Sequence, residues 1–276
     1  MIDQIIEWAP IIGLMLGAGV LAGFAAGLFG IGGGFVVVPA LFVMLPLLGG
    51  SEAELAHVAI GTSLATIVVT SLRSMQAHAR RGAVDFVLLK QWAPYIVVGS
   101  IAGVLFASLV SSSVLAIIFG VGVILMAIHF LYPILKSMKL GEDIPAGGGR
   151  MAIATGLGAS SSLLGIGGGT VAIIVMTLYG RSIHRAIGTA SGIGVIIAVP
   201  SAIGYAIIGL GVHGLPVGSL GYVNVIAALS IVAMSSFSAP WGAAAAHHLN
   251  PEWMKRIFGV YLLFIGAIMI RNGLTA

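Results

Sequence analysis

The sequence predicts an all-α membrane protein, and three observations lead to that fold class. Lys and Arg together number 12 and Asp and Glu 8 in a chain of 276 residues, and 59% of the residues are hydrophobic. A soluble domain carries about 25% charged residues. The charged residues are also absent from four long tracts, which are residues 8–51, 91–135, 151–180 and 186–251. Because a spanning helix needs roughly 20 apolar residues, these tracts hold several spans.

The chain contains two copies of one unit. The glycine motif GIGGG at residues 30–34 recurs at 165–169, and the segment AIGT at 59–62 recurs at 186–189. Further short matches follow in the same order, so chance resemblance between glycine-rich segments does not explain the pattern. We predict a first half at residues 1–140, a cytoplasmic linker at 141–150 and a second half at 151–276, all within one integrated transmembrane domain.

Each half is predicted to begin with a hairpin of short helices whose tip is the glycine motif. The arms are expected at residues 10–30 and 34–48 in the first half, and at 150–165 and 168–180 in the second. Arm 10–30 is long enough to cross the bilayer, so a full span there remains an alternative. Three longer helices follow each hairpin, predicted at 57–77, 86–108 and 113–135, then at 184–209, 222–246 and 254–272.

Basic residues in the short loops predict the orientation in the membrane. The loop at 78–90 carries Arg80 and Arg81, and Arg181 and Arg185 precede or open a later helix, so these segments are expected inside. The loop at 51–57 has two Glu and no basic residue and is expected outside. The two halves then enter the membrane from opposite faces, as inverted-topology repeats do. We expect a multi-pass protein of the cell's inner (plasma) membrane with both termini outside.

The glycine motifs are the predicted binding site for a small anion. Glycine permits left-handed backbone conformations and lets backbone amides approach a ligand. The helix after each motif would present free N–H groups and the positive end of its dipole. Two such ends form an anion site without a buried lysine, whereas the alternative is glycines that only permit close helix packing. The predicted backbone site consists of Gly32, Gly33, Gly34, Gly167, Gly168, Gly169 and Thr170.

Hydroxyl side chains near the start of the next helix in each half extend the predicted site. Thr62, Ser63, Thr189 and Ser191 are expected to donate hydrogen bonds to substrate oxygens. Back-bonding to a helix carbonyl is an equally weighted alternative for any one of them. Ser160-Ser161-Ser162 leads into the second tip and is expected to line the path.

Two histidines and one arginine are candidates for gating or for proton-linked transport. His57 and His184 open corresponding helices of the two halves, and capping or interface roles are the favoured alternative for both. Arg73 lies near the cytoplasmic end of its helix, where we expect it to extend to the interface; lining the path is the sharper alternative.

These motifs resemble those of the TauE/SafE family of membrane proteins. The resemblance rests on the paired glycine motifs, the two AIGT segments and the stretch Arg80–Asp85, and it extends over both halves. It implies an exporter or permease for sulfite, sulfoacetate or related organosulfur anions. The sequence departs from the family's pattern in two places: Asn224 stands where the first half has Asp85, and a Ser-rich run precedes the second motif only. These departures predict a pseudo-symmetric site whose two halves differ chemically.

We therefore predict a secondary transporter of a small anion, with sulfite or an organosulfur oxyanion as substrate, that works by alternating access around the glycine tips. The alternatives are an anion channel and a non-transport intramembrane enzyme. An enzyme would need a nucleophile and base or carboxylates within the spans, where Asp and Glu are absent, so no catalytic residue is assigned. We expect no cofactor, metal or nucleic-acid partner; the bilayer and the anion are the expected partners, and homo-oligomerisation stays open.

Overall fold

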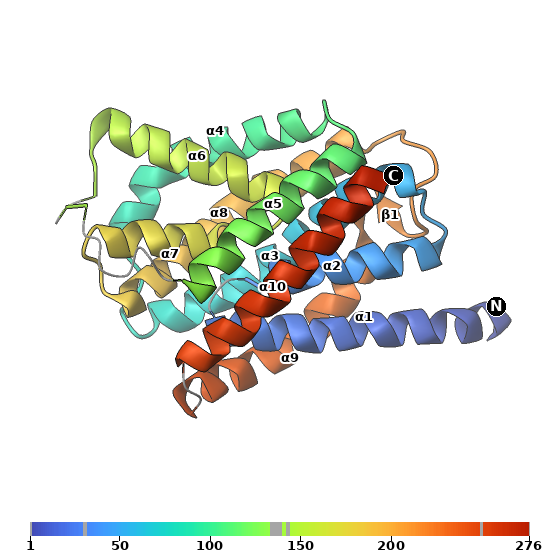
Figure 1. The fold of residues 1–276 in the computed structure, drawn as a ribbon, viewed down its shortest axis with the longest axis horizontal. Coiled ribbons are helices and arrows are strands. Elements are labelled where there is room, and N and C mark those ends of the chain that lie inside the picture. Colours follow the sequence, from blue (N-terminus) through green and yellow to red (C-terminus); the bar gives the residue numbers. More distant parts are fainter. Residues whose placement is uncertain (1, 30–31, 133–139, 142–143, 249–250, 276) are drawn as a thin grey trace.

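The computed structural model describes residues 2–29, 32–132, 140–141, 144–248 and 251–275 as a helical bundle (Figure 1). The all-α membrane fold class is thereby confirmed. Residues 30 and 31 of the first glycine motif, and 133–139 and 142–143 near the predicted linker, lie outside the described residues.

The two halves have the same order of long and short helices. The first half comprises α1 (Ile2–Phe29), α2 (Gly34–Met44), η1 (Leu45–Leu48), η2 (Glu52–Glu54), α3 (Leu55–Ala79), α4 (Phe86–Ala107) and α5 (Ser112–Leu131). The second comprises α6 (Gly147–Leu164), α7 (Gly169–Leu178), α8 (Ile183–Ile208), the ribbon β1 (Ser219–Leu220) and β2 (Val223–Asn224), α9 (Val225–His248) and α10 (Pro251–Thr275). Each predicted helix is present, α1 begins eight residues before its predicted start at residue 10, and the short ribbon was not expected.

Seven helical segments in the described chain are long and apolar enough to cross a membrane. They belong to α1, η2 with α3, α4, α5, α8, α9 and α10. The apolar part of α1, Pro10–Phe29, has 20 residues, which at 1.5 Å per residue is about 30 Å. The α1 arm is thus long enough to span, whereas α2 and α7 are short apolar helices.

The helices of one half pack chiefly against helices of the other. Helix α1 lies along α9 and α6 lies along α4, while α3 pairs with α8 and α5 pairs with α10. Gly61 faces Tyr205 and Gly194 faces Ser71, so α3 and α8 are antiparallel. In Figure 1, α1 and α6 enter the bundle from opposite ends. The two halves are therefore packed together along most of their long helices.

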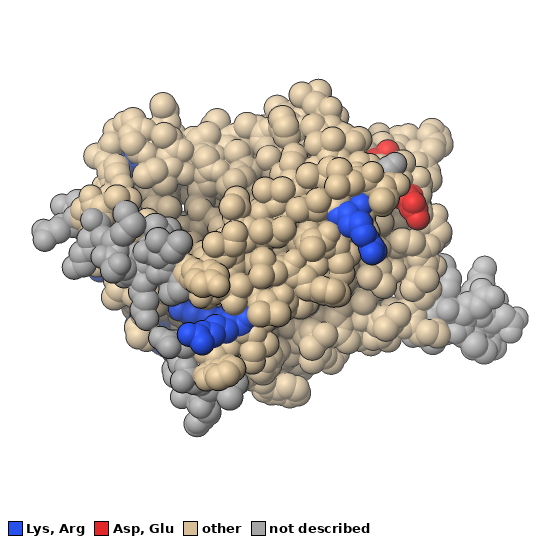
Figure 2. Space-filling view, viewed as in Figure 1, with Lys and Arg blue, Asp and Glu red and all other residues tan. Residues whose placement is uncertain are grey.

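The outside of the bundle is apolar between its two ends. On the face shown in Figure 2, Lys, Arg, Asp and Glu lie toward the ends and the middle carries none. Large apolar side chains are exposed instead, among them Leu21, Leu125, Ile203 and Phe264. Such a surface suits lipid, where backbone polar groups must be satisfied within helices.

Candidate functional site

The two glycine tips touch each other inside the bundle. A Cβ atom placed on Gly34 would clash with the carbonyl oxygen of Gly165 and lie 2.8 Å from Cα of Ile166. Only glycine allows the start of α2 to approach the end of α6 this closely. We call the two tips together, residues 32–34 and 165–169, the glycine junction.

Both tips use the left-handed backbone conformation that the sequence predicted for them. The φ angles are 77° at Gly32, 81° at Gly33, 64° at Gly167 and 69° at Gly168. Gly33 and Gly168 precede α2 and α7, and neither helix receives a side-chain cap from the described residues. The first-turn N–H groups and the positive ends of both helix dipoles therefore lie at the glycine junction.

The middle of α3 and α8 flanks the glycine junction. A Cβ on Gly32 would lie 3.9 Å from Cγ2 of Ile67, and one on Gly167 would lie 2.8 Å from the same methyl group. One turn later, Ser71 Oγ is 3.7 Å from a Cβ on Gly32 and 2.7 Å from a Cβ on Gly194 of α8. Sequence reasoning did not single out Ile67, Ser71 or Gly194, because their proximity depends on how α3 crosses α8.

The predicted hydroxyls of α3 hold elements of the second half in place. Ser63 Oγ donates to the carbonyl oxygen of Gly165 at 2.8 Å, and Thr62 Oγ1 accepts from the backbone N–H of Asn224 at 2.8 Å. Both side chains are fully buried. Ser63 therefore positions the second tip, and Thr62 positions the start of α9.

The predicted hydroxyls of α8 have comparable partners. Thr189 Oγ1 accepts from the backbone N–H of Asp85 at 2.9 Å. Ser191 Oγ lies 2.8 Å from Oγ of Ser74 and donates to the carbonyl of Ile187 at 3.1 Å. That last bond is the back-bonding alternative considered for these residues. A substrate-binding role for the four hydroxyls stays a prediction.

The replacement of Asp85 by Asn224 in the second half leaves the helix cap intact. Asp85 Oδ1 accepts from the N–H of Leu88 at 3.0 Å, and Asn224 Oδ1 accepts from that of Ala227 at 2.9 Å. Carboxylate and amide oxygens both serve as N-caps. The difference between the halves at this position is therefore one of charge.

Four buried hydroxyls on the helices of the second tip, or on helices that pack against them, have no hydrogen-bond partner in the described part of the chain. They are Ser161 on α6, Thr170 on α7, Ser100 on α4 and Ser201 on α8. Helix α4 packs against α6, and helix α8 packs against α6 and α7. Ser161 Oγ is 2.8 Å from a Cβ placed on Gly168. An unsatisfied buried hydroxyl costs about 1–3 kcal/mol, so these groups are suited to bind oxygens of a ligand.

Hydroxyls do not gather in the same way at the first tip. Ala26 and Phe35 occupy the positions that correspond to Ser161 and Thr170. A Cβ on Gly33 would meet the backbone of Ala22 and the methyl group of Ala26. The Ser-rich run before the second motif signalled this difference, whereas Ser100 and Ser201 were missed, although isolated polar residues within apolar spans are themselves a signal.

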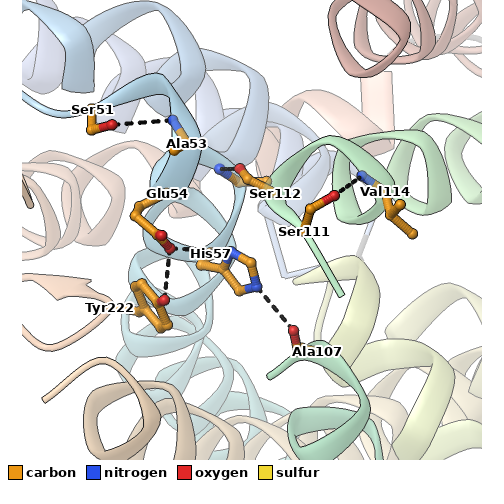
Figure 3. A network of polar contacts seen from close by, with 10 residues as sticks. Ser51, Ala53, Glu54, His57, Ala107, Ser111, Ser112, Val114 and Tyr222 are labelled. Carbon is orange, nitrogen blue, oxygen red and sulfur yellow. Dashed lines mark hydrogen bonds and ion pairs between the residues drawn. The ribbon is translucent and has the colours of Figure 1, made fainter. Parts of the chain in front are cut away.

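His57 belongs to a buried polar network at the start of α3 (Figure 3). Its Nε2 lies 2.9 Å from the carbonyl oxygen of Ala107, and its Nδ1 lies 3.7 Å from Glu54 Oε2. Tyr222 donates to the same Glu54 oxygen at 2.6 Å and stacks on the imidazole with ring centroids 4.8 Å apart. Burial raises the pKa of the Tyr222 phenol, and the hydrogen bond to Glu54 and its charge raise it further.

The other two gating candidates have different surroundings. His184 is exposed, although it corresponds to the buried His57. Arg73 is exposed as well, two positions after Ser71 on α3. Two positions are a rotation of about 200° around a helix, so Arg73 points away from the glycine junction, as expected for a residue that extends to the interface.

No group of three or more His, Asp or Glu side chains that could hold a metal occurs among the described residues.

Comparison with known proteins identifies relatives over nearly the whole chain. The model of the family described as sulfite exporter TauE/SafE matches residues 15–269. A "probable membrane transporter protein" of Haemophilus influenzae is 34% identical over 258 residues, which cover 93% of this chain and 97% of that protein. Proteins described in the same words from Methanocaldococcus jannaschii and Bacillus subtilis are 26% and 27% identical, over 96% and 93% of this chain and 97% and 96% of their own lengths. No solved structure matches the chain significantly.

Proposed function

This chain belongs to the sulfite exporter TauE/SafE family, and from that premise we propose that it is a secondary transporter whose substrate is sulfite or an organosulfur oxyanion. Membership of the family makes it a membrane transporter. The substrate and the mechanism are our proposal, and the glycine junction is its proposed binding site.

The observation that carries the proposal is the close approach of Gly34 to Gly165, beside the buried hydroxyls of Ser161 and Thr170 for which the described residues offer no hydrogen-bond partner. Amides of the first turns of α2 and α7 would bind the oxygens of the anion, helped by the helix dipoles. Ser161 and Thr170 would donate two further hydrogen bonds. The tracts that contain both tips carry no Lys or Arg, so the anion is held by dipoles and is not trapped by a full opposite charge.

The packing of the helices supports alternating access. Helix α1 lies on α9 as α6 lies on α4, and α3 and α5 pair with their own counterparts α8 and α10. This reciprocal pattern is expected of inverted-topology repeats. The halves would rock around the glycine junction and expose it first to one side of the membrane and then to the other.

Uptake into proteoliposomes tests the proposal. Purified protein should accumulate [³⁵S]sulfite, and unlabelled sulfate, thiosulfate, sulfoacetate and acetate in separate competitions should rank the substrates. Gly168→Ala should abolish uptake, because its Cβ would be strained at φ 69° and would lie 2.5 Å from Ile197 and 2.8 Å from Ser161.

Gly180→Ala is the matched control. Gly180 has a φ of 74°, yet a Cβ there would meet nothing within 4 Å. The control carries the same backbone strain without touching the proposed site, so its uptake should be preserved. Normal uptake by Gly168→Ala in a folded protein would refute the site, and conductance of single molecules in a planar bilayer would identify a channel.

A further inference from the structure

The corresponding helices α3 and α8 begin with opposite charges. Glu52 and Glu54 precede α3, where negative charge is favourable beside the positive end of the helix dipole. Arg181 precedes α8 and Arg185 lies in its first turn, where positive charge is unfavourable for the helix. The start of α8 is thus left strongly positive, and helix stability does not explain this choice of residues.

The two arginines line one narrow crevice with Asp85 and Thr189, which in this structure is too narrow to admit a water molecule, so an anion would have to part these side chains to enter. Arg185 Nη2 lies 3.7 Å from Asp85 Oδ2, and the Arg185 side chain is 52% exposed. Arg181 Nε is buried and has no hydrogen-bond partner in the described part of the chain. Among the described residues that line the crevice, two cations therefore face one carboxylate, and a distance of 3.7 Å exceeds the roughly 2.7–2.9 Å of a charge-assisted hydrogen bond.

We propose that Arg181 and Arg185 form an oxyanion-binding site that recruits the substrate before it reaches the glycine junction. This inference rests on the proposed function. The buried Nε of Arg181 and the guanidinium of Arg185 donate to the oxygens of the anion, which competes with Asp85 for Arg185. Guanidinium groups match the geometry of such oxyanions.

The position of Thr189 connects this site to the transport path. Thr189 lies one turn after Arg185 on the same face of α8 and binds the backbone N–H of Asp85. The glycine junction contacts the same helix further along, at Gly194. An anion that draws Arg185 from Asp85 would loosen the contact between α8 and the start of α4.

The opposite charges at the two helix starts give the site a direction. Anions concentrate at the start of α8, and the carboxylates at the start of α3 repel them. In the orientation that the basic loops predict, α8 begins on the cytoplasmic side. The recruitment site therefore favours export.

The test compares wild-type protein with Arg181→Gln, Arg185→Gln and the double variant in proteoliposomes. The initial rate of [³⁵S]sulfite transport is measured against sulfite concentration at low and high ionic strength. We expect the KM of the double variant to rise about tenfold or more, with little change in the maximal rate. The wild-type KM should rise with ionic strength, because screening weakens attraction by exposed charges. The KM of the double variant should not depend on ionic strength in this way.

Arg150→Gln is the matched control, since Arg150 also lies in the first turn of a helix, α6, on the same predicted side. The Arg150→Gln variant should have the KM and maximal rate of the wild type. Arg185→Lys should have a lower KM than Arg185→Gln, because it keeps a positive charge. Wild-type KM and salt dependence in a folded double variant would overturn the recruitment site alone. Absence of transport by wild-type protein for every anion would overturn the proposed function as well.

Discussion

The hydroxyl of Thr62 accepts a hydrogen bond from the backbone N–H of Asn224 at 2.8 Å, and this bond joins α3 of the first half to the start of α9 in the second. Its counterpart Thr189 accepts the N–H of Asp85 at 2.9 Å and joins α8 to the start of α4. Each threonine thus holds a helix that belongs to the other half. The two bonds give the halves a defined contact near each end of the α3–α8 pair.

Thr62→Val should destabilise the protein by about 1–3 kcal/mol, because the N–H of Asn224 would stay buried without an acceptor. Unfolding of the purified protein by SDS in mixed micelles measures this difference. Thr62→Ser keeps the acceptor and should lose much less. Equal stability of the Val variant and wild type would contradict the role assigned to this bond.

Ser161→Ala and Thr170→Val should leave the free energy of unfolding unchanged or raise it, because each removes a buried hydroxyl that has no partner in the described chain. The KM for [³⁵S]sulfite should nevertheless rise about tenfold for each, since a hydrogen bond to a charged group contributes about 1.5–3 kcal/mol. Ser160→Ala is the control, because Ser160, which the sequence suggested would line the path with Ser161, instead lies on the exposed side of α6 and donates to the carbonyl of Gly156 at 2.8 Å. An unchanged KM for both variants would remove these hydroxyls from the site.

Tyr222 should make stability depend on pH in the alkaline range. Burial, together with Glu54, raises the pKa of its phenol above the ordinary value of about 10. The folded protein then keeps a proton that the unfolded chain loses, so the stabilisation is complete below about pH 10 and declines as the pH rises beyond it. Thermal unfolding at pH 8 to 11 should show a smaller decline for Tyr222→Phe than for wild type, and parallel curves would exclude this contribution.

Single cysteines test the predicted orientation, because the natural chain contains none. Ala53→Cys lies in the loop expected outside, and Leu140→Cys lies in the segment expected inside. A membrane-impermeant maleimide should label residue 53 in intact cells and residue 140 only after permeabilisation. The reverse pattern would refute the topology and, with it, the export direction inferred from Arg181 and Arg185.

Much of the fold could be predicted from particular residues. Uncharged tracts located the spans, because charge is costly in lipid. The glycine runs located the starts of α2 at Gly34 and α7 at Gly169, since consecutive glycines disfavour a continuous helix. The β1–β2 ribbon was missed, because two residues per strand leave no alternating pattern to detect.

The candidate site was predictable only in outline. The glycine motifs named the backbone of both tips, but the pairing of Ser63 with Gly165 spans 102 positions in sequence. His57 and His184 open equivalent segments, yet one is buried against Tyr222 and the other is exposed. Two such similar local sequences do not distinguish these environments, because burial depends on which helix of the other half covers each residue.

The sequence by itself determined that this chain is a helical membrane protein whose helices break at two glycine motifs, because local composition decides where a helix can cross lipid or must break. Only the tertiary structure decided that Gly34 meets Gly165, that Ser161 lies beside Gly168 with no hydrogen-bond partner among the described residues, and that Arg181 and Arg185 share a crevice with Asp85. These relationships depend on how one half packs against the other, and residues far apart in the chain carry no local signal of that packing.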